Sequence, residues 1–328
     1  FMKVLLTGGA GYIGSHVALN LIEQGHNVHI IDNLSTGNSN LIPNKAEFSN
    51  CDIADTLKIE GILKKYSFDI VMHFAGYIQV EESVNFPEKY FENNTNNAIN
   101  FFNICKDSSL NKIVFSSTAS VYGNQDGKSF VSEEDKLNPQ NPYAESKMKT
   151  EEFLKNKSND FKYIILRYFN VAGADLSQRT GQISKKSTHL IKVLSELVVG
   201  KRDYVEVFGS DYNTPDGTAI RDYIHVSDLA DIHVEVAKYL IRNNNSEIFN
   251  CGYGIGYSVL DVINSLNKIY GNDINYKLSE RRKGDVEKLV SNIDKLEKHI
   301  DWKPKYNDLS TIIKSSIDWE KKLNEKIL

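Results

Sequence analysis

The sequence predicts an α/β protein built on a doubly wound parallel sheet, with a smaller C-terminal lobe interleaved with it. Through the first half, short apolar runs of strand length alternate with segments of helical periodicity, and a glycine-rich turn follows the first run. Apolar strands that alternate with helices are typical of a parallel sheet covered by helices on both faces. Ligands of such a sheet bind at the carboxyl ends of its strands.

The elements are expected in a regular order up to about Gly173. Strands are predicted at residues 3–7, 27–31, 47–50, 69–74, 112–116 and 163–167. Helices are predicted between them, at residues 14–24, 56–66, 93–106 and 143–155. Beyond Gly173 the alternation weakens, and polar stretches containing glycine separate shorter elements, as at 209–217 and 280–284.

One further strand, at residues 247–250, is expected to return to the main sheet. Each lobe is therefore expected to be built from two separate segments of the chain. The predicted main domain comprises residues 1–172 with 218–252. The predicted smaller domain comprises residues 173–217 with 253–328.

Composition excludes several classes of partner. The chain has 328 residues, a net charge of −4 and a pI of about 6.1, so it has no basic field for nucleic acid or an anionic membrane. Cys51, Cys105 and Cys251 are far apart, which predicts buried thiols in a reducing compartment. The apolar run near the N-terminus is too short for a signal peptide or a membrane span, so a cytoplasmic protein is expected. The histidines show no metal-ligand spacing, and no metal site is predicted.

The first predicted strand leads into a turn with the spacing G-x-x-G-x-x-G, formed by Gly8, Gly11 and Gly14. The missing side chains let the chain turn tightly and let a pyrophosphate approach the positive end of the next helix. Asp32 ends the second strand, where an acid can accept both hydroxyls of an adenosine ribose and repel a 2′-phosphate. The unit predicts a site for NAD rather than NADP, with Asn33 as a helper.

The third and fourth strands end in residues that suit further cofactor contacts. Asp52 and Ile53 suit an adenine clasp, and Phe74, Ala75 and Gly76 suit a close approach of the backbone. Each position also fits ordinary turn chemistry at the end of a strand.

The reaction is predicted on a helix that opens after Pro142. Tyr143 and Lys147 lie on one face of this helix. A free phenol, with a pKa of about 10, is a poor base at neutral pH. The Lys147 ammonium and an oxidised nicotinamide ring together are expected to bring the pKa of Tyr143 close to working pH. Thr118, at the end of a preceding strand, can hydrogen-bond the same substrate oxygen, which predicts proton abstraction coupled to hydride transfer.

Five segments carry a resemblance to a known family. They are residues 8–15, 115–123, 141–147, 167–170 and 221–226. Together they resemble the extended short-chain dehydrogenases/reductases, which have a Rossmann fold, and most closely the UDP-glucose 4-epimerase family, over essentially the whole chain. The resemblance implies an NAD-dependent isomerase that acts on a UDP-hexose through a transient 4-keto sugar.

By this resemblance the main domain would bind NAD and the smaller domain the nucleotide sugar. Tyr143 would be the base, Lys147 its electrostatic partner and ribose contact, and Thr118 the hydroxyl partner. Further cofactor contacts are implied at Tyr12, Ile13, Asp32, Asn33, Asp52, Ile53, Phe74, Ala75, Gly76, Asn94, Ser116 and Tyr168.

The resemblance also implies how UDP is held. Arg221 and Arg282 would clamp the diphosphate, for which a fork of guanidinium donors is suited. Asp285 would take the ribose hydroxyls. Further substrate contacts are implied at Asn170, His189, Leu190, Phe208 and Leu289. Two positions depart from the family pattern, since His189 replaces a common Asn and Ile78 replaces a Lys found in some members.

Leu289 bears on the range of substrates. The family places a gate there, beside the C2 substituent of the sugar, and tyrosine at the gate is typical of members restricted to hexoses. Leucine predicts a roomier, apolar pocket that accepts UDP-GlcNAc and UDP-GalNAc as well as UDP-glucose and UDP-galactose. The alternative is that Leu289 simply packs under its loop.

A homodimer is also expected. The family pairs the helices near 93–106 and 143–155 across a dimer interface. Apolar residues on these helices exceed what one sheet face needs, namely Phe101, Phe102, Phe153 and Leu154.

Other functions remain open. A sugar dehydratase needs an acid and a base at the two positions after Thr118, where Ala119 and Ser120 stand. A decarboxylase typically has Glu at the second of these positions. A UDP-glucuronate 4-epimerase and a non-catalytic NAD-binding regulator are the further alternatives, and the intact Tyr143 and Lys147 disfavour the regulator. The pathway, galactose metabolism or polysaccharide biosynthesis, is left open.

Overall fold

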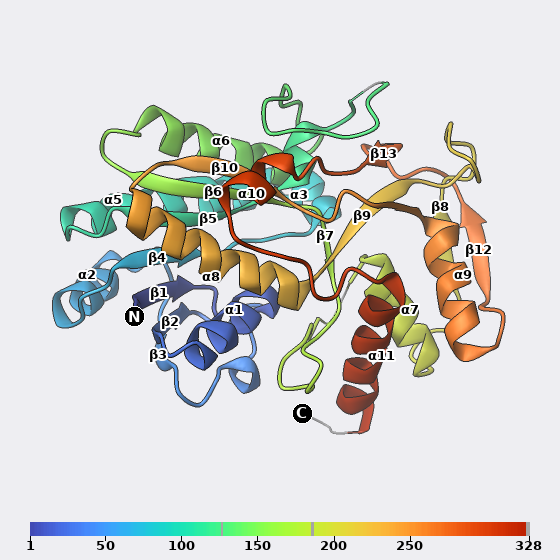
Figure 1. The fold of residues 1–328 in the computed structure, drawn as a ribbon, viewed down its shortest axis with the longest axis horizontal. Coiled ribbons are helices and arrows are strands. Elements are labelled where there is room, and N and C mark those ends of the chain that lie inside the picture. The colour runs from blue at the N-terminus through green and yellow to red at the C-terminus, as the bar shows by residue number, and fades with distance from the viewer. Residues whose placement is uncertain (126, 185–186, 326–328) are drawn as a thin grey trace.

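The computed structural model describes residues 1–125, 127–184 and 187–325, and its centre is a seven-stranded sheet (Figure 1). The strand order is β10-β6-β5-β4-β1-β2-β3. These strands are β1 (Lys3–Thr7), β2 (Asn27–Asp32), β3 (Glu47–Asn50), β4 (Ile70–His73), β5 (Lys112–Thr118), β6 (Lys162–Tyr168) and β10 (Glu247–Cys251). Every neighbouring pair is parallel, so the predicted doubly wound sheet is confirmed.

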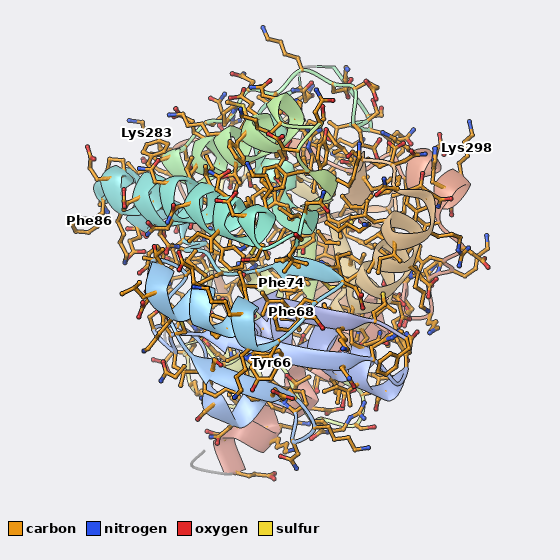
Figure 2. The ribbon with its side chains drawn as sticks, turned by 90° about the vertical axis from the view of Figure 1, so that its left-hand side faces the viewer. Tyr66, Phe68, Phe74, Phe86, Lys283 and Lys298 are labelled. Carbon is orange, nitrogen blue, oxygen red and sulfur yellow. The ribbon has the colours of Figure 1, made fainter. Side chains whose placement is uncertain are left out.

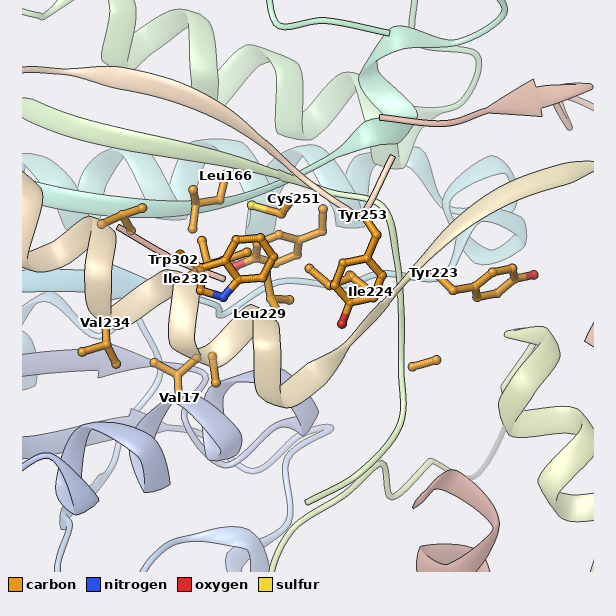
Figure 3. Close-up of a cluster of buried hydrophobic side chains, with 14 of the residues drawn as sticks. Val17, Leu166, Tyr223, Ile224, Leu229, Ile232, Val234, Cys251, Tyr253 and Trp302 are labelled. Atoms are coloured by element: carbon orange, nitrogen blue, oxygen red, sulfur yellow. The ribbon is translucent and has the colours of Figure 1, made fainter. Parts of the chain in front are cut away.

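Helices cover both faces of this sheet (Figure 1). One face is covered by α1 (Tyr12–Glu23) and α8 (Val226–Asn243), and the other by α2 (Thr56–Lys65), α5 (Ala98–Asp107) and α6 (Pro142–Asn156). Alternate residues of β1 enter opposite cores, as the two-residue period of a strand requires: Val4 and Leu6 pack with α1 and α8, and Leu5 packs with α2 and α5. Figure 3 shows the first of these cores.

The chain leaves the main sheet and returns to it. β10 pairs with β6, which confirms the strand predicted at residues 247–250. The intervening chain forms part of a second sheet, in which β9 (Ile220–His225) pairs with β7 (Asn170–Ala172), β11 (Gly256–Ser258) and β13 (Lys288–Leu289). A two-stranded sheet joins β8 (Val205–Phe208) to β12 (Tyr276–Ser279). The domain boundaries stay a prediction.

Shorter elements complete the fold. They are η1 (Ser39–Leu41), α3 (Val80–Asn85), α4 (Pro87–Tyr90), η2 (Phe91–Asn97), η3 (Ala119–Tyr122), α7 (Leu190–Val198), α9 (Val259–Tyr270), α10 (Asp294–His299) and α11 (Leu309–Glu325). The helix predicted at 93–106 is therefore two elements, because η2 is a π-helical segment that precedes α5. In the part of the chain that the structure describes, no helix is long and apolar enough to cross a bilayer.

The start of α6 follows from local sequence. Asn141 is its N-cap, and the side chain of Asn141 accepts a hydrogen bond from the backbone N–H of Ala144. Pro142 occupies the first helical position, where its missing N–H costs nothing. From this start, Lys147 and Tyr143 on α6 contact Ser116 and Thr118 of β5.

The apolar residues that supported a dimer have another role. Phe101, Phe102 and Leu154 are fully buried within the chain's own core, and Phe153 packs against the same cluster. Phe101, Phe102 and Leu154 are therefore not available at the surface, so these three side chains give no support to the expected dimer.

Exposed apolar side chains lie instead on α3 and the start of α4. Val84 and Phe86 are 53% and 61% exposed. Figure 2 shows Phe86 at the outer edge of the helical layer. Both α3 and α4 pack beside α6.

A buried ion pair joins α6 to the sheet. Nε and Nη2 of Arg167 donate to Oε1 and Oε2 of Glu151, at 3.1 and 2.7 Å, and both side chains are almost wholly inaccessible. Ser117 Oγ donates to the same carboxylate at 2.5 Å. The third guanidinium nitrogen donates to the hydroxyl of Tyr122 and the carbonyl of Glu133. With its polar atoms bonded, the pair stabilises one position of α6 against β5 and β6.

Arg167→Met is expected to lower the free energy of unfolding by about 3–5 kcal/mol, because it leaves the Glu151 carboxylate buried without its counter-charge. Urea denaturation measures the loss. The control is Arg179→Met: Arg179 pairs with Glu23 and Asp175 but is 44% exposed, so its loss should cost about 0–1 kcal/mol. Equal losses in the two variants would contradict the role given to burial.

Candidate active site

The turn between β1 and α1 leaves its backbone open to an anionic ligand. Gly8 has a φ of 71°, in the left-handed region that favours glycine, and a Cβ there would lie 2.6 Å from the Ala75 nitrogen. A Cβ at Gly14 would overlap the Gly8 carbonyl oxygen and lie 2.8 Å from Gly9 Cα. Gly11, the N-cap of α1, has no side chain to cap the helix, and no acidic residue occupies the first turn. The free N–H groups at this helix end fit a pyrophosphate.

Asp32 lies beside this turn. Its carboxylate is buried at the end of β2 and accepts hydrogen bonds from the backbone of Ala10 and Leu34, at 3.0 and 2.8 Å. Burial raises the pKa of Asp32, and the two backbone hydrogen bonds oppose the rise. Asn33 donates to Asp52 Oδ2 at 2.7 Å, so these two predicted adenosine contacts meet at the same edge of the sheet.

Three more predicted contacts converge after β4. A Cβ at Gly76 would lie 3.2 Å from both the Lys147 ammonium nitrogen and Asn94 Oδ1, so a side chain there would press on both groups. Asn94 is buried in η2, and its amide bonds the backbone N–H and carbonyl of Tyr77, each at 2.9 Å. Asn94 therefore holds the segment after β4 in place, a role the sequence did not indicate.

The remaining predicted cofactor contacts lie around this edge. Tyr12 donates its hydroxyl to the carbonyl of Gly173 at 2.6 Å, and Ile13 is partly buried on the same turn of α1. Ile53 is buried below Asp52, and Phe74 and Ala75 lead from β4 into Gly76.

Lys147 is buried on α6, and its ammonium donates to the carbonyl oxygen of Ser116 at 2.9 Å. Burial lowers the pKa of Lys147 to about 8, so the side chain remains largely cationic at neutral pH. Among the described residues it pairs with no carboxylate, so its charge stays available at the end of β5.

Tyr143 is half-buried and hydrogen-bonds the side chain of Thr118. Burial raises the pKa of Tyr143, and the hydrogen bond from Thr118 opposes the rise. The chain's own groups therefore do not produce the lowered phenol pKa expected from the sequence, because burial outweighs the hydrogen bond from Thr118. The expected contribution of the nicotinamide ring remains a prediction.

The substrate-side residues gather in a second group. The Arg282 guanidinium lies 3.8 Å from the centre of the Phe208 ring and, among the described residues, forms no ion pair. Burial and the charge of Arg282 both lower the pKa of His189, the N-cap residue of α7. His189, Leu190 and Asn170 line one pocket. Arg282 is thus an exposed cation, stacked on Phe208 and open to an anion.

Arg221 and Asp285 are bound to each other. Arg221 Nη2 lies 2.5 Å from Asp285 Oδ1 and also donates to the carbonyl of Val286. Arg221 is expected to bind the diphosphate and Asp285 a ribose. For both to do so, their ion pair must open, or each must bind its ligand while it stays paired.

Leu289 joins the two groups. It lies on β13 opposite Arg221 and is buried in a cluster with Ala119 and Val121 of η3, the turn that follows Thr118. The predicted gate position therefore packs against the turn that follows Thr118, and its effect on substrates stays a prediction. Ile78 is 56% exposed.

Two supporting residues were not singled out from the sequence. Glu151 continues the i, i+4 series of Tyr143 and Lys147 on α6, which was the available signal, and it binds Arg167 and Ser117. His233 is buried on α8, and its side chain hydrogen-bonds the Tyr168 hydroxyl. Within the described residues, no group of His, Cys, Asp or Glu is arranged to hold a metal ion, and the three cysteines are buried and free.

A parallel sheet with a glycine turn, a terminal acid on β2 and a Tyr–Lys pair beside Thr118 defines a class of enzyme. Residues 4–252 match the family model of the NAD dependent epimerase/dehydratase family, and the chain belongs to that family. Its cofactor is NAD, as the geometry of the sheet edge fits.

Similar proteins narrow the class. The chain is 42% identical over 327 residues to the UDP-glucose 4-epimerase of Azospirillum brasilense, covering 99% of this chain and 94% of that one. A crystal structure of UDP-glucose 4-epimerase from Stenotrophomonas maltophila, with bound NAD and formylated UDP-arabinopyranose, matches with a TM-score of 0.95, 32% identity and 99% coverage of both chains. The UDP-Glc/GlcNAc 4-epimerase of Campylobacter jejuni matches with a TM-score of 0.85 and 43% identity, covering 98% of this chain and 100% of that one. The chain is a member of the UDP-glucose 4-epimerase family.

Tyr143→Phe is expected to retain NAD and to lose about 10²–10⁴-fold in kcat, because it removes the hydroxyl that exchanges the proton. Turnover of UDP-galactose and the cofactor content of the purified protein measure the two effects. Tyr66→Phe, at the C-cap of α2 and packed against His29 (Figure 2 labels Tyr66), is the control and should keep wild-type kcat. Near-normal turnover by Tyr143→Phe would rule out its assignment as the base.

Proposed function

We propose that this protein interconverts UDP-glucose and UDP-galactose by NAD-dependent epimerisation at C4 of the hexose. The observation that carries the proposal is that Tyr143 and Lys147 of α6 meet Thr118 at the carboxyl end of β5. When bound, NAD supplies an acceptor and donor of hydride. The side chains of the protein then have to bind and orient the sugar and move one proton.

The chain's own residues suit this proton transfer. Tyr143 accepts the C4 hydroxyl proton and later returns it, and Thr118 hydrogen-bonds the same oxygen from the end of β5. The Lys147 ammonium lies close to Gly76 and Ser116, and with NAD bound its charge and that of the oxidised nicotinamide ring would together favour the phenolate over the phenol. Because the proton and the hydride are both returned, the cycle has no net redox change and NAD stays with the enzyme.

The grip on UDP is assigned to the second group of residues. Arg282, stacked on Phe208, presents a cation without a carboxylate partner in the described chain, which suits the diphosphate beside the uracil. Arg221 and Asp285, now paired, would separate toward phosphate and ribose. Asn170, His189 and Leu190 would border the sugar–phosphate end.

The other functions are less well supported. A dehydratase or a decarboxylase needs proton-transfer groups where the chain has Ala119 and Ser120, and η3 buries Ala119 against Val121 and Leu289. A UDP-glucuronate 4-epimerase shares the redox centre and differs only in the sugar site. A non-catalytic regulator would not need the buried Lys147 or the Thr118–Tyr143 hydrogen bond.

We further propose that the enzyme accepts N-acetylated sugars. Leu289 offers aliphatic surface where a tyrosine would bring a ring and a hydroxyl, and the UDP-Glc/GlcNAc 4-epimerase of Campylobacter jejuni is among its close structural matches. We place the enzyme in the cytoplasm. It would serve galactose metabolism, the supply of sugars for polysaccharides, or both.

One substrate panel tests the function and its range. The purified protein is incubated with UDP-galactose, UDP-GalNAc and UDP-glucuronate, with no NAD added, and the products are separated. We expect conversion of the first two at C4, and failure on all three would refute the proposed function. Conversion of UDP-glucuronate alone would support the glucuronate epimerase instead.

The same panel with Leu289→Tyr tests the gate. We expect kcat/KM for UDP-GalNAc to fall about 10–100-fold while that for UDP-galactose changes little, since differences of pocket size are worth about 1–3 kcal/mol. Val290→Ile, at the next buried position, is the control for repacking of the cluster. A wild type that ignores the acetamido sugar, or a tyrosine variant that accepts it equally well, would overturn this role of Leu289.

We also propose a homodimer through the α5–α6 layer, although Phe101, Phe102 and Leu154 no longer support it. Its support is the exposed apolar surface of Val84 and Phe86 beside α6. We expect light scattering at micromolar concentration to give a dimer mass, and Val84→Lys to raise the concentration at which the dimer dissociates. Leu57→Lys, equally apolar and 81% exposed on α2, should leave dissociation unchanged. A monomer mass for the wild type would contradict the proposal.

A further inference from the structure

Two tyrosines lie at the reactive end of the sheet. Tyr143 hydrogen-bonds Thr118, while Tyr168 lies in register with Thr118 on the neighbouring strand and hydrogen-bonds Ser116. A single proton transfer needs one base. The partners of the two hydroxyls distinguish the two residues.

The Tyr168 hydroxyl is committed to α8. Its oxygen lies 2.6 Å from Nε2 of His233, and Nδ1 of His233 lies 2.8 Å from the carbonyl oxygen of Leu229, one helical turn earlier. A carbonyl only accepts, so Nδ1 carries the ring hydrogen and Nε2 of the neutral ring is an acceptor. Burial lowers the pKa of His233 to about 4, so the ring is neutral at neutral pH and Tyr168 is the donor.

His233 also supports a second residue of the cofactor site. Its ring centre lies 5.0 Å from that of Phe74, at the end of β4, and 5.5 Å from that of Tyr168, at the end of β6. Both are residues for which a cofactor contact is predicted. His233 itself is wholly buried on α8, a helix whose neighbouring Leu229 and Ile232 pack into the core under the sheet (Figure 3).

We propose that His233 is a positioning residue of the cofactor site, which accepts a hydrogen bond from the Tyr168 hydroxyl, supports Phe74 and Tyr168, and leaves Tyr143 as the phenol that exchanges a proton with substrate. The part that concerns Tyr143 rests on the proposed function. The support of Phe74 and Tyr168 rests on contacts within the chain.

His233→Leu tests the proposal by removing the acceptor on α8 to which the buried Tyr168 hydroxyl donates. We expect kcat for UDP-galactose to fall about 10-fold with little change in KM, because Tyr168 and Phe74 lose the ring that holds them in place at the cofactor site. We also expect less NAD per chain after gel filtration, and a larger share of reduced nicotinamide by absorbance after incubation with substrate. A purely structural residue would lower thermal stability without moving this share.

Matched variants separate positioning from stability. His233→Gln can place an amide oxygen near the position of Nε2 and should restore most of kcat and NAD content. In a Tyr168→Phe background, His233→Leu should add little, since residues that act as a unit are not additive. His225→Leu is the control, because His225 is also buried at α8 but binds Ser227 and Ser315, and it should keep the wild-type share of reduced nicotinamide.

The outcomes decide between the possibilities. Wild-type kcat and NAD content in His233→Leu, or losses that add to those of Tyr168→Phe, would overturn the proposal. If His233→Leu does not fold, His233→Gln decides: NAD content nearer to wild type than that of Tyr168→Phe supports the proposal, and the reverse overturns it. A wild type that does not convert UDP-galactose would refute the proposed function, and NAD content would still test the role of His233.

Discussion

The buried ion pair between Glu151 and Arg167 is the constraint on which the active site depends. Moving two charges out of water costs several kcal/mol per ion, and the cost is offset only where the geometry and the remaining hydrogen bonds are good. Here the guanidinium of Arg167 binds the carboxylate of Glu151 through two nitrogens. Ser117 donates a further hydrogen bond to the carboxylate, and the Tyr122 hydroxyl accepts one from the guanidinium. Since Glu151 shares its helix face with Tyr143, one rigid contact fixes the distance from the phenol to the end of β5.

A second buried acid performs a similar task in the smaller sheet. Asp222 on β9 accepts hydrogen bonds from the backbone of Tyr253, Gly254 and Ser291 and from the Ser291 hydroxyl. These donors come from the segment after β10 and from the segment after β13. Burial raises the pKa of Asp222, and the four hydrogen bonds oppose the rise. Arg221 and the strand of the gate are thereby held at a set distance from the main sheet.

Sequence patterns predicted what depends on local chemistry. The buried apolar strands, the glycine turn and the Tyr143–Lys147 spacing all follow from neighbours in the chain, and the structure has them. The π-helical η2 was not predictable, because it depends on Asn94 bonding the distant Tyr77 and on the Asn94 carbonyl accepting from Thr150. The hydrogen bond between His233 and Tyr168 was not predictable either, because the two residues are far apart in the sequence. The raised pKa of Tyr143 was not predicted because helical spacing does not reveal how far the fold buries the phenol.

The late return of β10 to the main sheet has a consequence for synthesis. Until that strand leaves the ribosome, β6 has an open edge of unpaired N–H and C=O groups, and open edges invite pairing with other chains. Pairing across so long a stretch of sequence is also slow, since loop closure precedes any gain. The nascent chain therefore has an incomplete, aggregation-prone sheet while the β7–β9 region is being translated. Protection by a chaperone during that interval would matter more for this topology than for one whose sheet is completed in chain order.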